Sequence, residues 1–247
     1  MSDWNDPRTT QSPFGNGPVL NGEVLGAGTY DEGLRSHMLS IYNYMASGVL
    51  LSGIVAMLFA NSGMALQLMG TPLGWIIQLA PLGFILAMSF GLNKMQTSTL
   101  QVLFWAFCTV MGLSLSTVFV IYTGGSIAVA FFASAAAFAG LSLYGQTTKT
   151  SLSAMGSFMV MGLIGLIVAS LINLFLQSEA LYWALSVIGV LIFAGLTAWD
   201  TQRLKEEYAY VAGTELAGKA VVMGALSLYL DFINMFLYLL RFLGDRR

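Results

Sequence analysis

The most informative segment of this chain is AVVMGALSLYLDFINMFLYLLRFL, residues 220–243. It is apolar and, as an α-helix, long enough to cross the hydrocarbon core of a bilayer. Asp231 lies near its middle, where an ionised carboxylate costs about 2.5–3.5 kcal/mol to insert. Because such a group has to be paired, hydrated or protonated, this helix must turn one face away from lipid.

Other polar residues share the helical face of Asp231. They recur at spacings of three and four, which places them in one stripe of an α-helix. The stripe consists of Gly224, Ser227, Asp231, Asn234, Tyr238 and Arg241. The other faces are formed by Val, Leu, Phe, Ile and Met. We therefore expect the stripe to point into a helical bundle, where Ser227, Asn234 and Tyr238 line a polar pathway.

The composition of the whole chain is that of a polytopic membrane protein. Of its 247 residues, 57% are hydrophobic and only 9% are charged, whereas soluble domains carry about 25% charged residues. The net charge of −2 gives no reason to expect nucleic acid as a partner. Cys108 and His37 are the single cysteine and the single histidine, which argues against a disulfide and against a Cys- or His-rich metal site. We expect no cofactor.

Six further apolar segments precede the last one, and none of them contains a charged residue. Each is near the length of a membrane-spanning helix. Their limits are 39–60, 73–92, 101–122, 126–144, 152–176 and 181–199. In the fourth segment, the small residues of 130–140 predict close helix packing. Residues 1–34 are polar and rich in Pro and Gly, which predicts a disordered tail. The sequence thus predicts an all-α membrane protein, a seven-transmembrane helical bundle over residues 35–247.

The basic residues indicate the orientation in the membrane. If the N-terminus is cytoplasmic, the inside segments hold Arg8, Arg35, Lys94, Lys149, Arg203, Lys205 and Lys219. The outside connections between helices then hold none. Arg241, Arg246 and Arg247 conflict with this pattern, because seven full crossings place the C-terminus outside. Either the bias of the earlier loops prevails, or the last segment is re-entrant, and we favour seven crossings.

Three features of the sequence predict the compartment: it has no signal peptide, it has no Asn-x-Ser/Thr sequon, and its polar tail is of a bacterial type. These features favour a multi-pass protein of a bacterial inner membrane with a cytoplasmic N-terminus. An endomembrane location is the alternative.

Asp200 is the second carboxylate of interest. It ends the sixth apolar segment in GLTAWDTQRLK, residues 195–205. One interpretation is an ion pair with Arg203 one turn later, worth roughly a few tenths of a kcal/mol. In the other, Asp200 faces Asp231 and the two share a proton, because adjacent carboxylates cannot both ionise cheaply. Such a pair would titrate as a unit and, when deprotonated, would offer hard oxygen ligands suited to Ca²⁺.

Depth in the membrane argues against this pairing. Asp231 lies about 18 Å along its helix, whereas Asp200 reads as close to the membrane surface. The two can meet if the sixth helix continues through Glu206 and Glu207, or if water reaches down to Asp231.

Three further residues are candidates for the same site. Asn43 belongs to a weaker polar stripe of the first segment and could line the same interior, although helix–helix hydrogen bonding is the favoured interpretation. Arg203 and Lys94 could act as cationic gating partners of a carboxylate. For Lys94 the alternative is a positive charge that only sets the topology.

Residues 195–205, together with GALSLYLDFINMFLYLLRFLG over residues 224–244, resemble the C-terminal signature of a known family. This is the Bax inhibitor-1 family (transmembrane Bax inhibitor motif proteins), in its bacterial form. The resemblance extends over roughly residues 30–244 and is most specific in the last part of the chain. It implies seven helices, with the last at the centre of two three-helix layers.

The resemblance also implies a function. Members are described as pH-sensitive Ca²⁺ leak channels, in which Asp200 and Asp231 match a di-aspartyl proton sensor beside the pore, with Ca²⁺ bound only in passing. Some bacterial relatives are instead described as modulators of a membrane-anchored ATP-dependent protease. Asn93-Lys94 departs from the several basic residues that relatives carry there, which weakens the case for Lys94 as a gating partner.

Three functions are compatible with these residues. The first is a cation leak, with the lipid bilayer, Ca²⁺ and protons as its partners. The second is an intramembrane aspartyl protease, which needs two aspartates as acid and base. Its Gly-x-Gly-Asp motif is absent, since Leu228, Tyr229 and Leu230 precede Asp231. The third is a non-transporting regulator of other membrane proteins. We expect the first and expect no enzyme.

Overall fold

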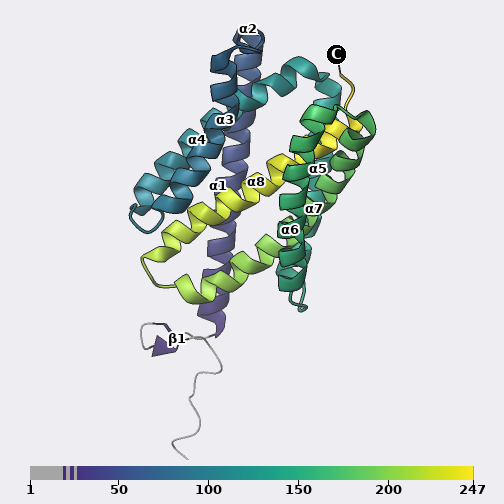
Figure 1. Ribbon diagram of the computed structural model, residues 1–247. Coiled ribbons are helices and arrows are strands. Elements are labelled where there is room, and N and C mark those ends of the chain that lie inside the picture. The colour runs from purple at the N-terminus through teal and green to yellow at the C-terminus, as the bar shows by residue number, and fades with distance from the viewer. Residues whose placement is uncertain (1–18, 21–22, 25–26, 247) are drawn as a thin grey trace, which may run out of the picture.

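The computed structural model describes residues 19–20, 23–24 and 27–246 and is a bundle of long helices (Figure 1). Within these residues, seven helices are long and apolar enough to cross a membrane. They are α1 (Ala27–Asn61), α3 (Pro72–Gly91), α4 (Thr97–Ile121), α5 (Gly124–Thr147), α6 (Ser153–Leu176), α7 (Glu179–Val211) and α8 (Leu216–Leu243). The predicted all-α membrane bundle with seven candidate spans is confirmed.

Three short elements complete the described chain. The helix α2 (Met64–Leu68) connects α1 to α3. The strands β1 (Val19–Leu20) and β2 (Glu23–Val24) pair antiparallel ahead of α1. The remainder of the predicted disordered tail, residues 1–18, 21–22 and 25–26, lies outside the described residues.

Two of the spanning helices extend well beyond their apolar segments. α1 begins at Ala27, so residues 27–34, which the sequence assigned to the tail, are helical. α7 continues to Val211, which leaves only residues 212–215 between α7 and α8. Apolar runs mark the part of a helix that lipid can surround, whereas helical hydrogen bonding continues into polar sequence beyond it. Hydropathy alone therefore made both helices too short.

α8 lies between two groups of helices (Figure 1). On one side α4 contacts both α1 and α3, and on the other α7 contacts both α5 and α6. α8 itself packs against α1, α4, α5 and α7. Its most hydrophobic stretch is 67% buried, against at most 39% in the other six spans. This position shields the polar residues of α8 from lipid.

The contacts of the C-terminus show which end of the bundle it occupies. Tyr122, after α4, forms a backbone bridge with Arg246, and the Thr123 N–H donates to the Asp245 carbonyl at 3.2 Å. Arg246 Nη2 also donates to the Tyr182 hydroxyl, near the start of α7, at 2.7 Å. The C-terminus therefore lies beside the α4–α5 and α6–α7 turns, and α1 begins at the opposite end (Figure 1). With α8 as one continuous helix of 28 residues, this arrangement agrees with seven full crossings.

A buried polar contact at Tyr229 joins three helices at the core. The Tyr229 and Ser52 hydroxyl oxygens are 2.6 Å apart, and Ser52 donates to the Cys108 carbonyl at 2.7 Å. Because Ser52 has only one hydroxyl hydrogen, Tyr229 is the donor to Ser52. The Tyr229 ring also packs edge-to-face on Phe107, with 5.3 Å between centroids. This satisfied polar network ties α1, α4 and α8 together.

The thiol of Cys108 offers a direct test of this packing. It is fully buried and is the only cysteine in the chain. In detergent, we expect a maleimide to label it at least about a hundredfold more slowly than in denaturant, because the thiol reacts only from opened molecules. Intact mass spectrometry measures the rate, and a Cys108→Ser variant carrying exposed Ser98→Cys is the control. Rapid labelling of the folded wild-type protein would contradict this core.

Candidate functional site

Asp200 and Asp231 meet across the seam between α7 and α8. Their carboxyl groups are in hydrogen-bonding contact, and the residues are only 7% and 5% exposed. The sequence predicted that the two acids can meet if the sixth helix continues through Glu206 and Glu207. α7 does continue through both residues as one helix. Two carboxyl oxygens are both acceptors, so the contact is favourable only with a proton between them.

Arg203 supplies the positive charge of the site. Its Nη2 lies 3.0 Å from Asp200 Oδ1, so the predicted i,i+3 ion pair is present alongside the pairing of the two acids. It also donates to the Ser227 hydroxyl at 3.4 Å, and its guanidinium lies 4.9 Å from the centre of the Trp199 ring. The Arg203 side chain is 42% exposed, so solvent screens its attraction for the carboxylate. Arg203 thus links the buried acids to the surface of the bundle.

Two carboxyl oxygens of the site remain without hydrogen bonds. They are Asp200 Oδ1 and Asp231 Oδ2, which find no such partner in the described part of the chain. The contact of Asp200 Oδ1 with Arg203 is therefore ionic and is not aligned as a hydrogen bond. Buried polar atoms of this kind are rare and call for a ligand, a water or a proton.

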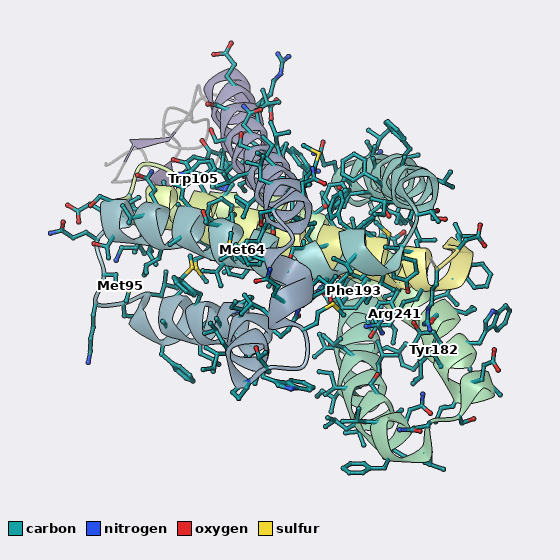
Figure 2. The ribbon with its side chains drawn as sticks, turned by 90° about the horizontal axis from the view of Figure 1, so that it is seen from above. Met64, Met95, Trp105, Tyr182, Phe193 and Arg241 are labelled. Atoms are coloured by element: carbon teal, nitrogen blue, oxygen red, sulfur yellow. The ribbon has the colours of Figure 1, made fainter. Side chains whose placement is uncertain are left out.

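The rest of the polar stripe also lies at or near α7. Tyr238 stacks on Phe193 of α7, with 5.8 Å between ring centroids, and Figure 2 shows Phe193 beside α8. Ser227 accepts the hydrogen bond from Arg203 of α7. The Asn234 amide donates to the Leu230 carbonyl of its own helix at 2.8 Å. The stripe thus faces the bundle. Whether Ser227, Asn234 and Tyr238 line an ion pathway remains a prediction.

The structure does not bring two of the predicted site residues to the aspartates. Asn43 is exposed on the outer surface of α1, on the same face as Ser36 and Ser40. Lys94 is exposed in the α3–α4 turn, and the charges that act on the two acids are their own and that of Arg203. Spacing groups residues on one helix face, but it does not say whether that face is turned inward.

The sequence did not predict the roles of two residues close to Asp200 in the chain. Trp199 lies under the Arg203 guanidinium, and their i,i+4 spacing is a signal that could have predicted this stacking. Gln202 is buried, accepts from the Leu152 N–H at 2.7 Å and donates to the Thr150 carbonyl at 3.0 Å. These partners are 50 and 52 residues away in the sequence, so no local pattern could reveal them. Gln202 anchors α7 to the start of α6.

The two acids offer few ligands for a metal ion. The described residues contain no group of three or more His, Cys, Asp or Glu side chains placed to hold a metal ion. Ca²⁺ takes six to eight oxygen ligands. With only two carboxyl groups, the site would have to complete the shell with water and carbonyl oxygens, so any binding would be weak.

Comparison with known proteins identifies the family. The family model described as "Inhibitor of apoptosis-promoting Bax1" matches residues 34–247. An uncharacterised protein of Rickettsia prowazekii is 51% identical over 221 residues, which is 89% of this chain and 93% of that protein. The inner membrane protein YbhL of Escherichia coli K12 is 43% identical over 219 residues, 87% of this chain and 94% of YbhL. The family match spans both aspartates and nearly the whole bundle. The chain therefore belongs to the Bax inhibitor-1 family of membrane proteins, as its C-terminal residues predicted.

Proposed function

We propose that this protein is a passive cation leak channel, conducting Ca²⁺ and gated by protonation of the Asp200–Asp231 pair. The observation that carries the proposal is the contact between these two buried carboxyl groups. Two carboxylates in contact cannot both be ionised cheaply, so the pair exchanges a proton as one unit. A change of pH therefore changes the charge at the middle of the α7–α8 seam.

The two protonation states differ in what they do to the seam. With a proton between them, the acids bond to each other and hold α7 against α8. Without it, two like charges face each other where the effective dielectric constant is low, and they repel strongly. Arg203 touches Asp200 and offsets only part of this charge. The ionised pair then attracts a divalent cation, and a weak two-carboxylate site also lets it leave, as conduction requires.

We place the N-terminus at the cytoplasmic face of a bacterial inner membrane. The exposed or half-buried lysines gather at the end of the bundle where α1 begins, in the turns or helix ends of Lys94, Lys149 and Lys219. The positive-inside rule favours that end as cytoplasmic. The name of YbhL as an inner membrane protein supports the compartment.

Ca²⁺ flux into liposomes that contain the purified protein tests the proposed function. With a Ca²⁺ indicator trapped inside, we expect flux above that of empty liposomes, changing between about pH 5 and about pH 8. Addition of an ionophore at the end of each trace gives the total capacity and corrects for liposome number.

The outcomes separate the candidate functions. Flux of monovalent cations without Ca²⁺ would contradict the assigned ion. No flux above empty liposomes at any pH would contradict the channel and favour the alternative, a non-transporting modulator of a membrane-anchored ATP-dependent protease.

A further inference from the structure

A cavity lined by both charged and apolar side chains lies at the C-terminal end of the bundle, about ten residues along α8 from Asp231. It has a volume of about 810 Å³ and is formed by the end of α6, the start of α7 and the end of α8. Figure 2 shows Arg241 and Tyr182 in this region, where α8 meets α7. Its polar lining includes Asn173, Gln177, Glu179, Tyr182, Arg241 and Arg246.

One tyrosine holds two arginines at the wall of this cavity. Arg246 Nη2 donates to the Tyr182 hydroxyl at 2.7 Å, and its guanidinium lies 5.2 Å from the centre of that ring. The Arg241 guanidinium lies 5.9 Å from the same ring centre. Hydrogen bonding to Tyr122 raises the pKa of Arg246, so its positive charge is permanent. The cavity thus has two exposed arginine cations that contact one tyrosine ring.

Within the described residues, neither of these arginines forms an ion pair. Among the described residues, the ion pair that the structure contains is Arg203–Asp200, and neither Arg241 nor Arg246 contacts a carboxylate. Glu179 lines the same cavity, but it lies in the first turn of α7, where the helix N-terminus stabilises its charge. Among the residues that line the cavity, two guanidinium groups against one carboxylate leave an excess of positive charge, which an anion would neutralise.

Aromatic residues beside the cavity indicate that it lies at the level of the lipid headgroups. Trp183 and Phe242 pack against each other beside it, with 5.1 Å between centroids, and both are exposed. Trp and Tyr side chains, such as Trp183, are enriched at the membrane–water interface. Trp183 and Leu174 both line the cavity and are 57% and 64% exposed, so the polar wall continues into an apolar surface that faces lipid.

We propose that this cavity binds the phosphate of a phospholipid from the leaflet at the C-terminal end of the bundle. Guanidinium groups bind phosphate oxygens through two parallel charge-assisted hydrogen bonds, which suits Arg241 and Arg246. The amides of Asn173 and Gln177 offer polar contacts to the glycerol and headgroup, and the acyl chains follow the apolar surface of α6 and α7. This role also accounts for arginines at the end where the positive-inside pattern predicts none.

Native mass spectrometry of the delipidated protein with added phosphatidylglycerol tests this proposal. In the Arg241→Gln/Arg246→Gln variant, we expect the apparent Kd to rise about tenfold or more, because both charge-assisted contacts are lost. The matched control is Lys94→Gln/Lys149→Gln, which removes the same charge from exposed residues at the other end of the bundle. Its affinity should stay within about twofold of wild type.

Additional experiments distinguish a lipid phosphate from free inorganic phosphate and control for misfolding of the variant. A galactolipid with the same acyl chains but no phosphate should bind far more weakly, and equal binding would overturn the proposal. Displacement of the lipid by equimolar inorganic phosphate would assign the site to a free anion instead. Equal lipid affinity of the Gln variant and wild type would also overturn it, leaving the arginines only to cap α8. If the Gln variant unfolds, the Arg241→Lys/Arg246→Lys variant provides the test. It keeps both positive charges but lacks the planar guanidinium groups that bind phosphate through two hydrogen bonds, so weaker binding is expected. Unchanged binding would contradict the proposal.

Discussion

Replacing Asp231 with Asn is expected to abolish the pH dependence of cation flux. Asparagine keeps the shape of the carboxyl group but neither binds nor releases a proton near neutral pH. The variant therefore imitates the protonated acid at every pH. From about pH 5 to about pH 8, its flux should stay at the level that wild type reaches at its acid limit. The liposome assay measures this ratio directly.

Asp200→Asn is expected to remove the same transition. The wild-type step belongs to the pair, since the two acids share one proton across the α7–α8 seam. With either acid replaced, the remaining carboxyl group has no acidic partner and the shared step is lost. Two flat profiles would place both residues in one coupled site. Persistence of the transition in both variants would contradict the sensor.

His37 provides the matched control for these variants. It is the only histidine of the chain, and histidine is the side chain whose ordinary pKa falls within the range tested. It is buried, its Nε2 has no hydrogen-bond partner in the described chain, and its ring lies 5.2 Å from that of Tyr208 on α7. We expect His37→Gln to keep the wild-type profile. Loss of the transition in this variant would make His37 the sensor instead.

The number of spans and the inward stripe of α8 were predictable because the membrane leaves few alternatives. In lipid, every backbone polar group must be bonded internally, so each long apolar run predicts a helix. A charged residue such as Asp231 in such a run must face protein. Both statements need only local sequence, and the structure agrees with them at α8.

The partners of that stripe were much harder to predict. The contact of Asp200 with Asp231 depends on how far α7 extends, and its polar turns beyond Trp199 leave no hydropathy signal. Asn43 is a second example of a position that the sequence could not predict. Its polar stripe on α1 has the same spacing as that of α8, but it faces outward. Which face is buried is decided by the shapes of the neighbouring helices, and no spacing rule contains that information.

The small residues of α5 also show that the sequence alone does not reveal which positions make close helix contacts. The run 130–140 predicted close packing of α5, and Ala130 and Ser134 are indeed buried. Gly140, at the end of the run, has nothing within 4 Å of the place where a Cβ would lie. The tight contact is at Gly145, where a Cβ would collide with the carbonyl oxygen of Ala198 on α7.

Gly145→Val is expected to be among the most destabilising substitutions in this protein. The colliding atom belongs to the backbone of α7 and cannot turn away as a flexible side chain would, so α5 and α7 must separate. Overpacking of a core costs about 1–3 kcal/mol, and a backbone clash lies at or above the upper end of that range. Separation also breaks the contact between the Ser142 and Thr201 hydroxyls, which are 3.3 Å apart. Unfolding by sodium dodecyl sulfate, followed by circular dichroism, measures the free energy of unfolding.

Gly140→Val is the matched control for this experiment. It makes the same change in the same helix, with the same loss of backbone freedom and the same β-branched side chain, but at an exposed position without neighbours. Its effect should stay within about 0.5 kcal/mol, as for substitutions away from packed features. Equal destabilisation by both variants would mean that helix propensity, rather than the α5–α7 contact, sets the cost. A large difference would show that α5 holds the α7 turn that carries Asp200, since Ala198 and Thr201 lie on either side of that acid.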